Sequence, residues 1–275
     1  ILYAVPVLLG VTFAVFLIIS LIPGDPATAI LGSYATPENV ENLNRQLGLD
    51  KPFFQIYLIW VVNILQGDFG TSYSLNRPVI DEVVERFQAT LILSGSSFLI
   101  CSIIGIFFGI ISSALQYSFF DKIITFSVIL GISIPSFFLG MMMILLFTVE
   151  LKLLPASGMY SLYGGGDLID LLKHLIMHST ALAIVSTGVV VRLSRSIMLE
   201  ILRLDFIRTA RSKGLKEYRV IFIHAFRLAI VSILPILGLQ AGFVLSGAVY
   251  IEIVFQWPGV GRMLVDSILT RDIML

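Results

Sequence analysis

Charged residues are scarce in this chain. Asp, Glu, Lys and Arg make up 13% of its 275 residues, whereas 57% are hydrophobic. Together with a mean hydropathy of +0.97 and apolar runs of membrane-spanning length, this composition excludes a soluble globular protein. The only cysteine, Cys101, lies in an apolar run, which excludes a disulfide framework or a cysteine metal cluster within the chain and favours a packing role.

The motifs of several enzyme classes are also missing. A phosphate-binding loop would need Gly-x-x-x-x-Gly-Lys-Ser/Thr, and Ser212-Lys213-Gly214 reverses that order. The chain has no His-Glu-x-x-His zinc motif and no paired membrane aspartates. We therefore predict no catalytic residue and no cofactor in this chain.

The apolar runs predict an all-α polytopic membrane protein, because an α-helix needs about 20 apolar residues to cross the bilayer. Five spans are expected, at residues 1–22 and at about 89–115, 123–150, 171–191 and 228–250. A cleaved signal peptide is the alternative for the first run, but the run is longer than a signal core and lacks a small-residue cleavage pattern.

Residues 23–88 are polar and hold eight acidic and four basic residues. Thr36 followed by Pro37 predicts the start of a helix, and the apolar stretch 56–65 is too short to span a membrane. We expect a small extracytoplasmic domain here, and a transmembrane core in residues 89–275.

Half of the basic residues lie in one segment. Residues 192–227 contain nine of the 18 Lys and Arg residues and three acidic residues, a net charge of +6. Short loops rich in Lys and Arg stay on the cytoplasmic side, so this segment sets the topology, with the chain starting inside and residues 23–88 outside. Binding of lipid headgroups by these charges is the simpler explanation of such a loop.

The same segment has a helical pattern. Helix-forming residues run from Ser196 to Lys213, and Gly214 stands where a helix end favours glycine. A helix over 197–213 would place a row of apolar side chains on one face, formed by Leu199, Leu202, Phe206 and Ala210. That face could meet the membrane or a partner protein.

Several motifs in this chain resemble those of one transporter family. Leu204-Asp205-Phe206-Ile207-Arg208-Thr209-Ala210-Arg211-Ser212-Lys213-Gly214-Leu215, followed by His224-Ala225-Phe226-Arg227, resembles the coupling-loop signature of ABC importer permeases in the dipeptide, oligopeptide and nickel branch. Four further motifs resemble that branch, in its order: Pro23-Gly24-Asp25-Pro26, Leu47-Gly48-Leu49-Asp50-Lys51-Pro52, Gly67-Asp68-Phe69-Gly70-Thr71-Ser72 and Trp257-Pro258-Gly259-Val260-Gly261-Arg262.

This resemblance implies a permease subunit in a bacterial or archaeal cytoplasmic membrane. The partners it implies are a second homologous permease, two cytoplasmic ABC ATPases that bind ATP and magnesium, an extracytoplasmic solute-binding protein and membrane lipid, with no nucleic acid. A cytoplasmic coupling loop at 195–227 would contact the ATPases, through Leu204, Asp205, Arg208, Thr209, Ala210, Arg211, Lys213, Gly214 and Leu215. The family would continue into a sixth span after Leu275, and the chain starts at Ile1 without Met, so we expect both ends to be trimmed.

Three side chains in or near the spans are candidates for the translocation pathway. Pro135 should bend its helix, and Arg192 and Glu252 are ionisable groups whose burial in a membrane is costly. The alternatives are a static kink at Pro135 and interfacial positions for the two charged groups. His174 and His178 would share a helix face, but two imidazoles without a third ligand make an incomplete metal site, so packing is the simpler role and no metal site is predicted.

The sequence thus predicts the permease subunit of an ATP-driven importer of di- or oligopeptides. Import of nickel or a metal-chelate complex by the same architecture is the alternative. An ATP-independent secondary transporter is a second alternative, although charges within the spans are few and no inverted repeats are recognisable.

Overall fold

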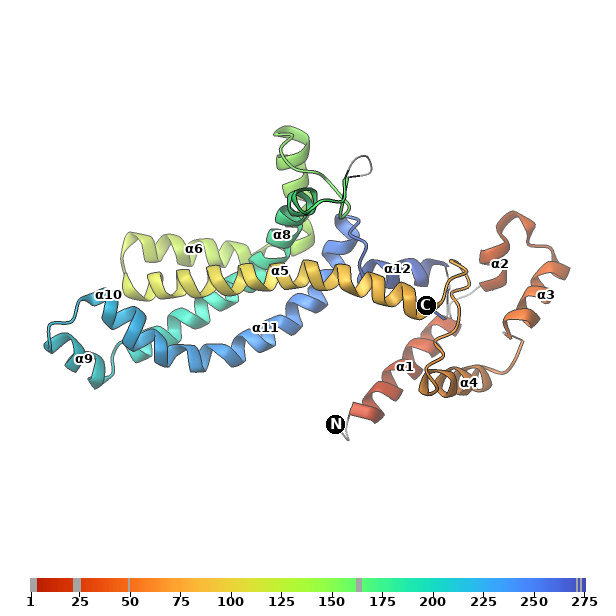
Figure 1. Ribbon diagram of the computed structural model, residues 1–275, viewed down its shortest axis with the longest axis horizontal. Helices are drawn as coiled ribbons and strands as arrows, with labels where there is room; N and C mark the ends of the chain where they lie inside the picture. The colour runs from red at the N-terminus through yellow and green to blue at the C-terminus, as the bar shows by residue number, and fades with distance from the viewer. Residues whose placement is uncertain (1–3, 22–25, 49, 162–164, 271, 273) are drawn as a thin grey trace. The chain divides into compact units, whose positions relative to one another are not determined.

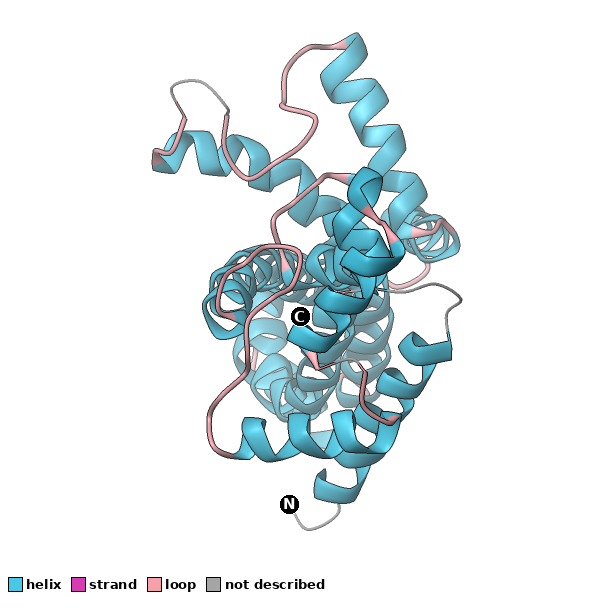
Figure 2. Cartoon of the chain, turned by 90° about the vertical axis from the view of Figure 1, so that its right-hand side faces the viewer, coloured by secondary structure: helices cyan, strands magenta, loops and turns pink. Residues whose placement is uncertain are grey.

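The computed structural model describes residues 4–21, 26–48, 50–161, 165–270, 272 and 274–275. Helices joined by loops make up these residues, and Figure 2 shows no strand among them. The chain divides into two compact units, one of residues 1–87 and 263–275 and the other of residues 88–262. The boundary that we expected between residues 22 and 23 lies outside the described residues, as do Pro23, Gly24, Asp25 and Leu49 of the motifs.

The first unit contains α1 (Ala4–Leu21), α2 (Pro26–Leu31), a 3-10 turn (Gly32–Tyr34), α3 (Pro37–Leu47) and α4 (Phe53–Leu65). The helix start predicted at Thr36 and Pro37 is confirmed, because the Thr36 hydroxyl accepts a hydrogen bond from the Asn39 N–H at 3.3 Å. Aromatic rings join α1 to α4, with the Phe13 and Tyr57 centroids 5.3 Å apart.

Ser72, the last residue of the motif at 67–72, is part of a buried hydrogen-bond network in the same unit. The Ser72 hydroxyl donates to the Asp272 carboxylate at 2.6 Å, and the N–H and hydroxyl of Ser74 donate to it at 3.0 and 2.9 Å. Burial opposes the ionised carboxylate, but these hydrogen bonds outweigh burial and hold the pKa of Asp272 below its usual value. The network ties this motif to the last residues of the chain.

The second unit is a group of long helices (Figure 1). The unit contains most of α5 (Val79–Ala114), then α6 (Phe119–Ser133), α7 (Ser136–Met143) with the π-helical segment η2 (Ile144–Glu150), α8 (Leu168–Ile201), the short helices α9 (Asp205–Ser212) and α10 (Glu217–Arg219), the π-helical segment η3 (Val220–Ala225) and α11 (Phe226–Val254). Helix α12 (Val260–Thr270) begins in this unit, but most of its residues belong to the first. The long helix α8 packs against α6, α7 and α11. Figure 1 places α9 and α10 at the end of this unit where α5 turns into α6.

Two hydrophobic clusters hold the helices of this unit together. One surrounds Phe255 and Trp257, both fully buried, and includes side chains of α5, α8 and α11. The other includes Met198 of α8, Ile207 of α9 and Val220 of η3. The second cluster is the one that fixes the position of the basic segment.

The expected count of five spans is not confirmed. Among the described residues, α5, α8 and the helical run Glu217–Val254 are long and apolar enough to cross a membrane, and the pair α6 with α7–η2 makes a fourth if it counts as one span. The axes of that pair are bent by 102°. The first predicted span, residues 1–22, is described only from Ala4 to Leu21, and its apolar part there is Ala4–Ile18.

Candidate functional site

The basic segment forms a short helix and not the long one that we predicted over 197–213. Helix α8 continues to Ile201, the backbone leaves helical geometry at Leu204 (φ −71°, ψ 151°), and α9 then covers only Asp205–Ser212. Residue propensity permits an uninterrupted helix here, but an eight-residue helix depends on tertiary packing for its stability. The break lets α9 turn its apolar side chains toward the second cluster.

The structure divides the row of apolar side chains that we predicted on one helix face. Ile207 is fully buried and Ala210 is 8% exposed, and both belong to the cluster with Met198 and Val220. Phe206, which we placed with Ala210 on a face that could meet the membrane or a partner protein, is 42% exposed. The helix therefore docks through Ile207 and Ala210 and turns Phe206 outward.

The end of α9 agrees with the prediction. Gly214 has φ +74°, a left-handed conformation that favours glycine, and its N–H donates to the Arg211 carbonyl at 2.9 Å. The Leu215 N–H closes the turn by donating to the Ala210 carbonyl at 3.4 Å. These bonds fix the direction in which the chain leaves α9 for α10.

The outer face of α9 is charged and open to solvent. Arg208 lies 3.6 Å from Asp205, and both side chains are largely exposed. Arg211 forms an ion pair with Glu217 of α10 at 2.6 Å. The hydrogen bonds that Arg211 donates to the Glu217 carboxylate raise the pKa of Arg211 above its usual value. Exposed pairs of this kind contribute about 0–1 kcal/mol each, so the buried side chains and not these pairs dock the helix.

All nine residues predicted for coupling lie in or next to α9. Leu204 precedes its first residue, Thr209 donates its hydroxyl to the Asp205 carbonyl at 3.0 Å, and Lys213 follows its last residue. Leu215 is partly buried against the same cluster as Ile207. Solvent reaches Leu204, Asp205, Arg208, Thr209, Arg211, Lys213 and Gly214.

An ion pair between distant residues, which the sequence did not reveal, lies near this end of α8. Arg195 donates to the Asp121 carboxylate at 2.9 Å from Nε and 2.8 Å from the terminal nitrogen. The Ser112 hydroxyl and the Tyr117 N–H also donate to this carboxylate, which is nearly buried. The α5–α6 turn is thus joined to α8. A polar turn and a basic segment were visible in the sequence, but 74 residues separate the partners.

Arg192, the arginine that we singled out, lies one turn before Arg195 and is exposed. In the described part of the chain its guanidinium makes no hydrogen bond or ion pair. It lines a hollow between α6 and α8, together with Arg195 and Arg203. Its position differs from that of a buried pathway charge.

Glu252 is fully buried and holds a loop in place. Its carboxylate accepts hydrogen bonds from the Thr90 hydroxyl at 2.6 Å and from the Arg262 N–H at 3.1 Å. The indole of Trp257 donates to the Ala89 carbonyl at 2.8 Å. A Cβ on Gly259 would overlap the Glu252 carboxylate, which explains glycine at this position of the Trp257–Arg262 motif. These contacts favour a positioning role for Glu252.

His174 and His178 are both buried in the helix α8. The His178 ring lies against Phe255 with centroids 4.1 Å apart and against Trp257 at 5.4 Å. The Nδ1 of His174 is 2.9 Å from the Asp170 carbonyl. Within the described residues, no three His, Cys, Asp or Glu side chains form a cluster that could hold a metal.

Pro135 stands between two helices and not inside one. It is the residue before α7, with φ −59° and ψ 135°, at the 102° bend that separates α6 from α7. We expected Pro135 to bend one long helix from within. A proline directly before the first residue of a helix breaks no hydrogen bond inside that helix. Ser136 follows the bend and lines a hollow of about 390 Å³ together with Ser186 of α8 and Gln240 of α11. Ser186 and Gln240 were not among the predicted pathway residues, although both are polar residues within apolar runs.

Comparison with known proteins identifies the family. Residues 105–275 match the family described as binding-protein-dependent transport system inner membrane component, and residues 1–94 match the one described as the N-terminal part of such membrane components. A protein of Brucella abortus (strain 2308) described as a peptide transport system permease is 40% identical over 270 residues, which cover 98% of this chain and 85% of the relative.

The names of two further relatives specify the length of the transported peptide. The dipeptide transport system permease protein of Escherichia coli (strain K12) is 37% identical over 290 residues, covering 98% of this chain and 86% of that protein. A di/tripeptide transport system permease protein of Pseudomonas aeruginosa (strain UCBPP-PA14) is 38% identical over 287 residues, with 98% and 85% covered. This chain therefore belongs to the permeases of binding-protein-dependent ABC importers, in the dipeptide and oligopeptide branch, and is a multi-pass component of the inner membrane.

Proposed function

We propose that this chain forms part of the translocation pathway for di- or oligopeptides and couples that pathway to ATP hydrolysis by cytoplasmic partner subunits. A second homologous permease completes the pathway, and an extracytoplasmic binding protein delivers the solute. ATP and magnesium bind to the ATPase subunits. The peptide substrate is supported by the names of relatives that are 37–40% identical to this chain.

The observation that carries the coupling proposal is the docking of α9. Ile207 is fully buried in a cluster that also contains side chains of α8, η3 and α11. A force applied to the exposed face of α9 therefore reaches the two long helices that flank it in sequence, because a packed core resists deformation. The ion pair of Asp121 with Arg195 extends this connection to the start of α6.

For the pathway itself we propose the hollow lined by Ser136, the residue that follows Pro135. Ser136, Ser186 and Gln240 give it hydroxyl and amide groups in otherwise apolar helices. A peptide that crosses a membrane needs partners for its backbone N–H and C=O groups, since each unsatisfied group costs several kcal/mol. Gln240 offers both a donor and an acceptor. Of the three pathway residues predicted from sequence, we retain Pro135. We assign Glu252 to loop positioning, and Arg192 lies at a different hollow.

The test uses the complete transporter with its binding protein, reconstituted in proteoliposomes. Gly214→Pro requires φ near −65° where the backbone has +74°, and it removes the N–H that bonds to Arg211. Asp205→Arg reverses the charge in the first turn of α9. We expect both variants to assemble and to hydrolyse ATP at the basal rate, without stimulation by dipeptide. Lys122→Gln, an exposed charge change on α6, is the control.

Stimulation at the wild-type level in both variants would refute coupling through α9. Stimulation of the wild-type complex by Ni²⁺ and not by dipeptides would refute the peptide substrate and leave the coupling proposal intact. The two parts of the proposal are thus tested separately.

A further inference from the structure

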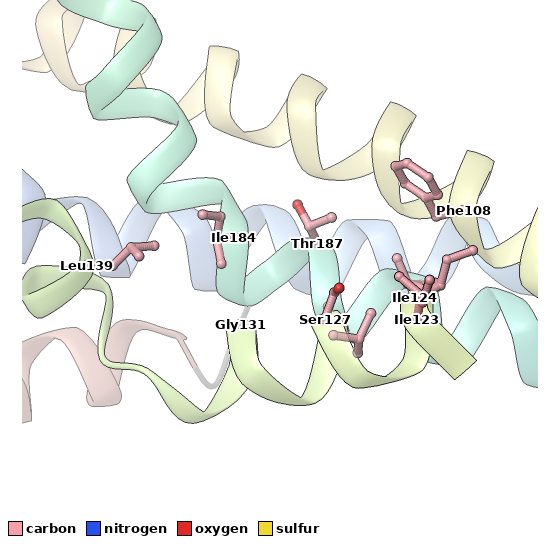
Figure 3. A pocket seen from close by; sticks show the side chains of 11 residues that line it. Phe108, Ile123, Ile124, Ser127, Gly131, Leu139, Ile184 and Thr187 are labelled. Atoms are coloured by element: carbon pink, nitrogen blue, oxygen red, sulfur yellow. The ribbon is translucent and has the colours of Figure 1, made fainter. Parts of the chain in front are cut away.

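Two hollows lie next to each other between α6 and α8. The first measures about 500 Å³ and is lined almost entirely by apolar side chains. Figure 3 shows Phe108 from α5, Ile123 and Ile124 from α6 and Ile184 from α8 around it, with the hydroxyl groups of Ser127 and Thr187. Its volume lies within the range of about 300–1,000 Å³ that is usual for sites of small ligands.

The second hollow measures about 480 Å³ and shares Val128 and Val191 with the first. Its lining is cationic, with Arg192, Arg195 and Arg203 against one acidic side chain, Glu200. The shared valines place an apolar space beside a charged one, as a single amphipathic ligand requires.

Two of these arginines are available to a ligand. Arg195 is engaged with Asp121 at 2.8 Å. Arg192 and Arg203 are exposed, and within the described residues neither side chain makes a hydrogen bond or ion pair. Arg192 is in α8 and Arg203 is in the turn that follows it, and both line the second hollow. Guanidinium groups bind phosphate oxygens well because several N–H donors point in one direction.

We infer that the two hollows together bind one anionic phospholipid, with an acyl chain in the apolar hollow and the headgroup phosphate at Arg192 and Arg203. A peptide fits the apolar hollow poorly, since its backbone groups would find only the Ser127 and Thr187 hydroxyls, and Thr187 already donates to the Ala183 carbonyl at 2.8 Å. An acyl chain needs no hydrogen bonds. The arginines lie toward the α9 end of α8, the side that the basic segment assigns to the cytoplasm, where basic pockets between membrane helices bind lipid headgroups.

The test measures lipid retained by the complete transporter. The complex is reconstituted in nanodiscs containing equal amounts of phosphatidylglycerol and phosphatidylcholine, extracted in mild detergent, and analysed by native mass spectrometry. The double variant Arg192→Gln, Arg203→Gln removes the headgroup contacts. Its matched control is Lys216→Gln, Arg227→Gln, which removes the same charge from exposed positions outside both hollows.

A second pair of variants tests the apolar hollow. Ser127→Trp places a large ring inside it, whereas Phe126→Trp changes the neighbouring residue, which is 64% exposed and does not line it. We expect the wild type and both controls to retain one phosphatidylglycerol, in preference to phosphatidylcholine. Retention should fall at least threefold in the arginine variant and in Ser127→Trp.

Three results would overturn the inference. Equal retention in all variants would mean that the lipid belongs to the general annulus. Equal retention of the two lipids by the wild type would remove the role of the arginines. A disulfide between a cysteine at Ser127 and the second permease would show that a protein partner covers the hollow. None of these readouts depends on transport, so they are independent of the proposed coupling.

Discussion

Replacing Ile207 by alanine tests whether α9 must be docked to transmit force. Ile207 is fully buried, and it and Ala210 are the buried side chains of this helix. Alanine is a better helix former than isoleucine, so the intrinsic stability of α9 does not fall. Any loosening in Ile207→Ala therefore reports the loss of tertiary packing.

The expected magnitude follows from burial. Replacing a buried isoleucine by alanine costs about 2–5 kcal/mol through lost burial and the remaining cavity. Since about 1.4 kcal/mol corresponds to a tenfold change in an equilibrium constant, the docked population of α9 relative to the undocked one falls about 30-fold or more. The same substitution at Ile223, which is 53% exposed, should change stability by no more than about 0.5 kcal/mol.

Two measurements on the assembled transporter follow these effects. Hydrogen exchange of the α9 amides should accelerate by about the same factor in Ile207→Ala and remain unchanged in Ile223→Ala. Dipeptide-stimulated ATP hydrolysis and uptake should fall together in Ile207→Ala, while basal hydrolysis persists, because an undocked helix moves without moving α8 and α11.

Unchanged exchange in Ile207→Ala would show that the buried contact does not dock the helix. Faster exchange with full stimulation would show that docking is not needed for coupling, and the proposed transmission of force from α9 to α8 and α11 would then be wrong. Faster exchange in the Ile223→Ala control would assign the effect to a general loss of stability.

Three other predictions concern the rest of the molecule. Asp121→Asn and Arg195→Gln should each lower the free energy of unfolding by about 1–3 kcal/mol, less than the loss of a fully buried pair because Arg195 is partly exposed. In thermal unfolding, the double variant should lose less stability than the sum of the two single losses. Additive losses would mean that the two side chains do not interact. Gly259→Ala should reduce the amount of folded permease in the membrane, because its Cβ would overlap the buried Glu252 carboxylate under the loop. Size-exclusion chromatography of the detergent-solubilised protein measures this amount, and a wild-type elution profile would contradict the packing. A cysteine at Asn42 should react with an impermeant reagent in intact cells and one at Lys216 only after permeabilisation, and the reverse pattern would overturn the topology.

Several features could be predicted from the sequence because their causes are local or compositional. The apolar composition and the long hydrophobic runs predict a helical membrane protein, since only helices and closed barrels satisfy their backbone groups in a bilayer. Thr36 and Gly214 mark helix ends through local backbone chemistry, and the structure confirms both. The motifs along the chain indicated the permease family that the comparisons show.

The boundaries of the basic segment could not be predicted in this way. Helix propensity from Ser196 to Lys213 is uninterrupted, and the break before Asp205 arises because Ile207 and Ala210 are buried against residues of α8 and η3. Local propensity differs by fractions of a kcal/mol between residues, whereas burial of a large side chain contributes about 1.5–3 kcal/mol. Tertiary packing therefore determines both the ends of α9 and the side chains that it buries.

The partners of charged groups were likewise decided only by the tertiary structure. The sequence singled out Arg192, but the fold pairs Arg195 with Asp121 and leaves Arg192 exposed at the hollow between α6 and α8. It also buries Glu252 beneath the loop that contains Gly259. The sequence by itself determined the class of protein and the location of its charge, because the amino-acid composition sets the free-energy cost of transferring each segment from water into the membrane. Which charge meets which partner depends on the packing of helices that are far apart in the chain, and that packing is fixed only when the whole core forms.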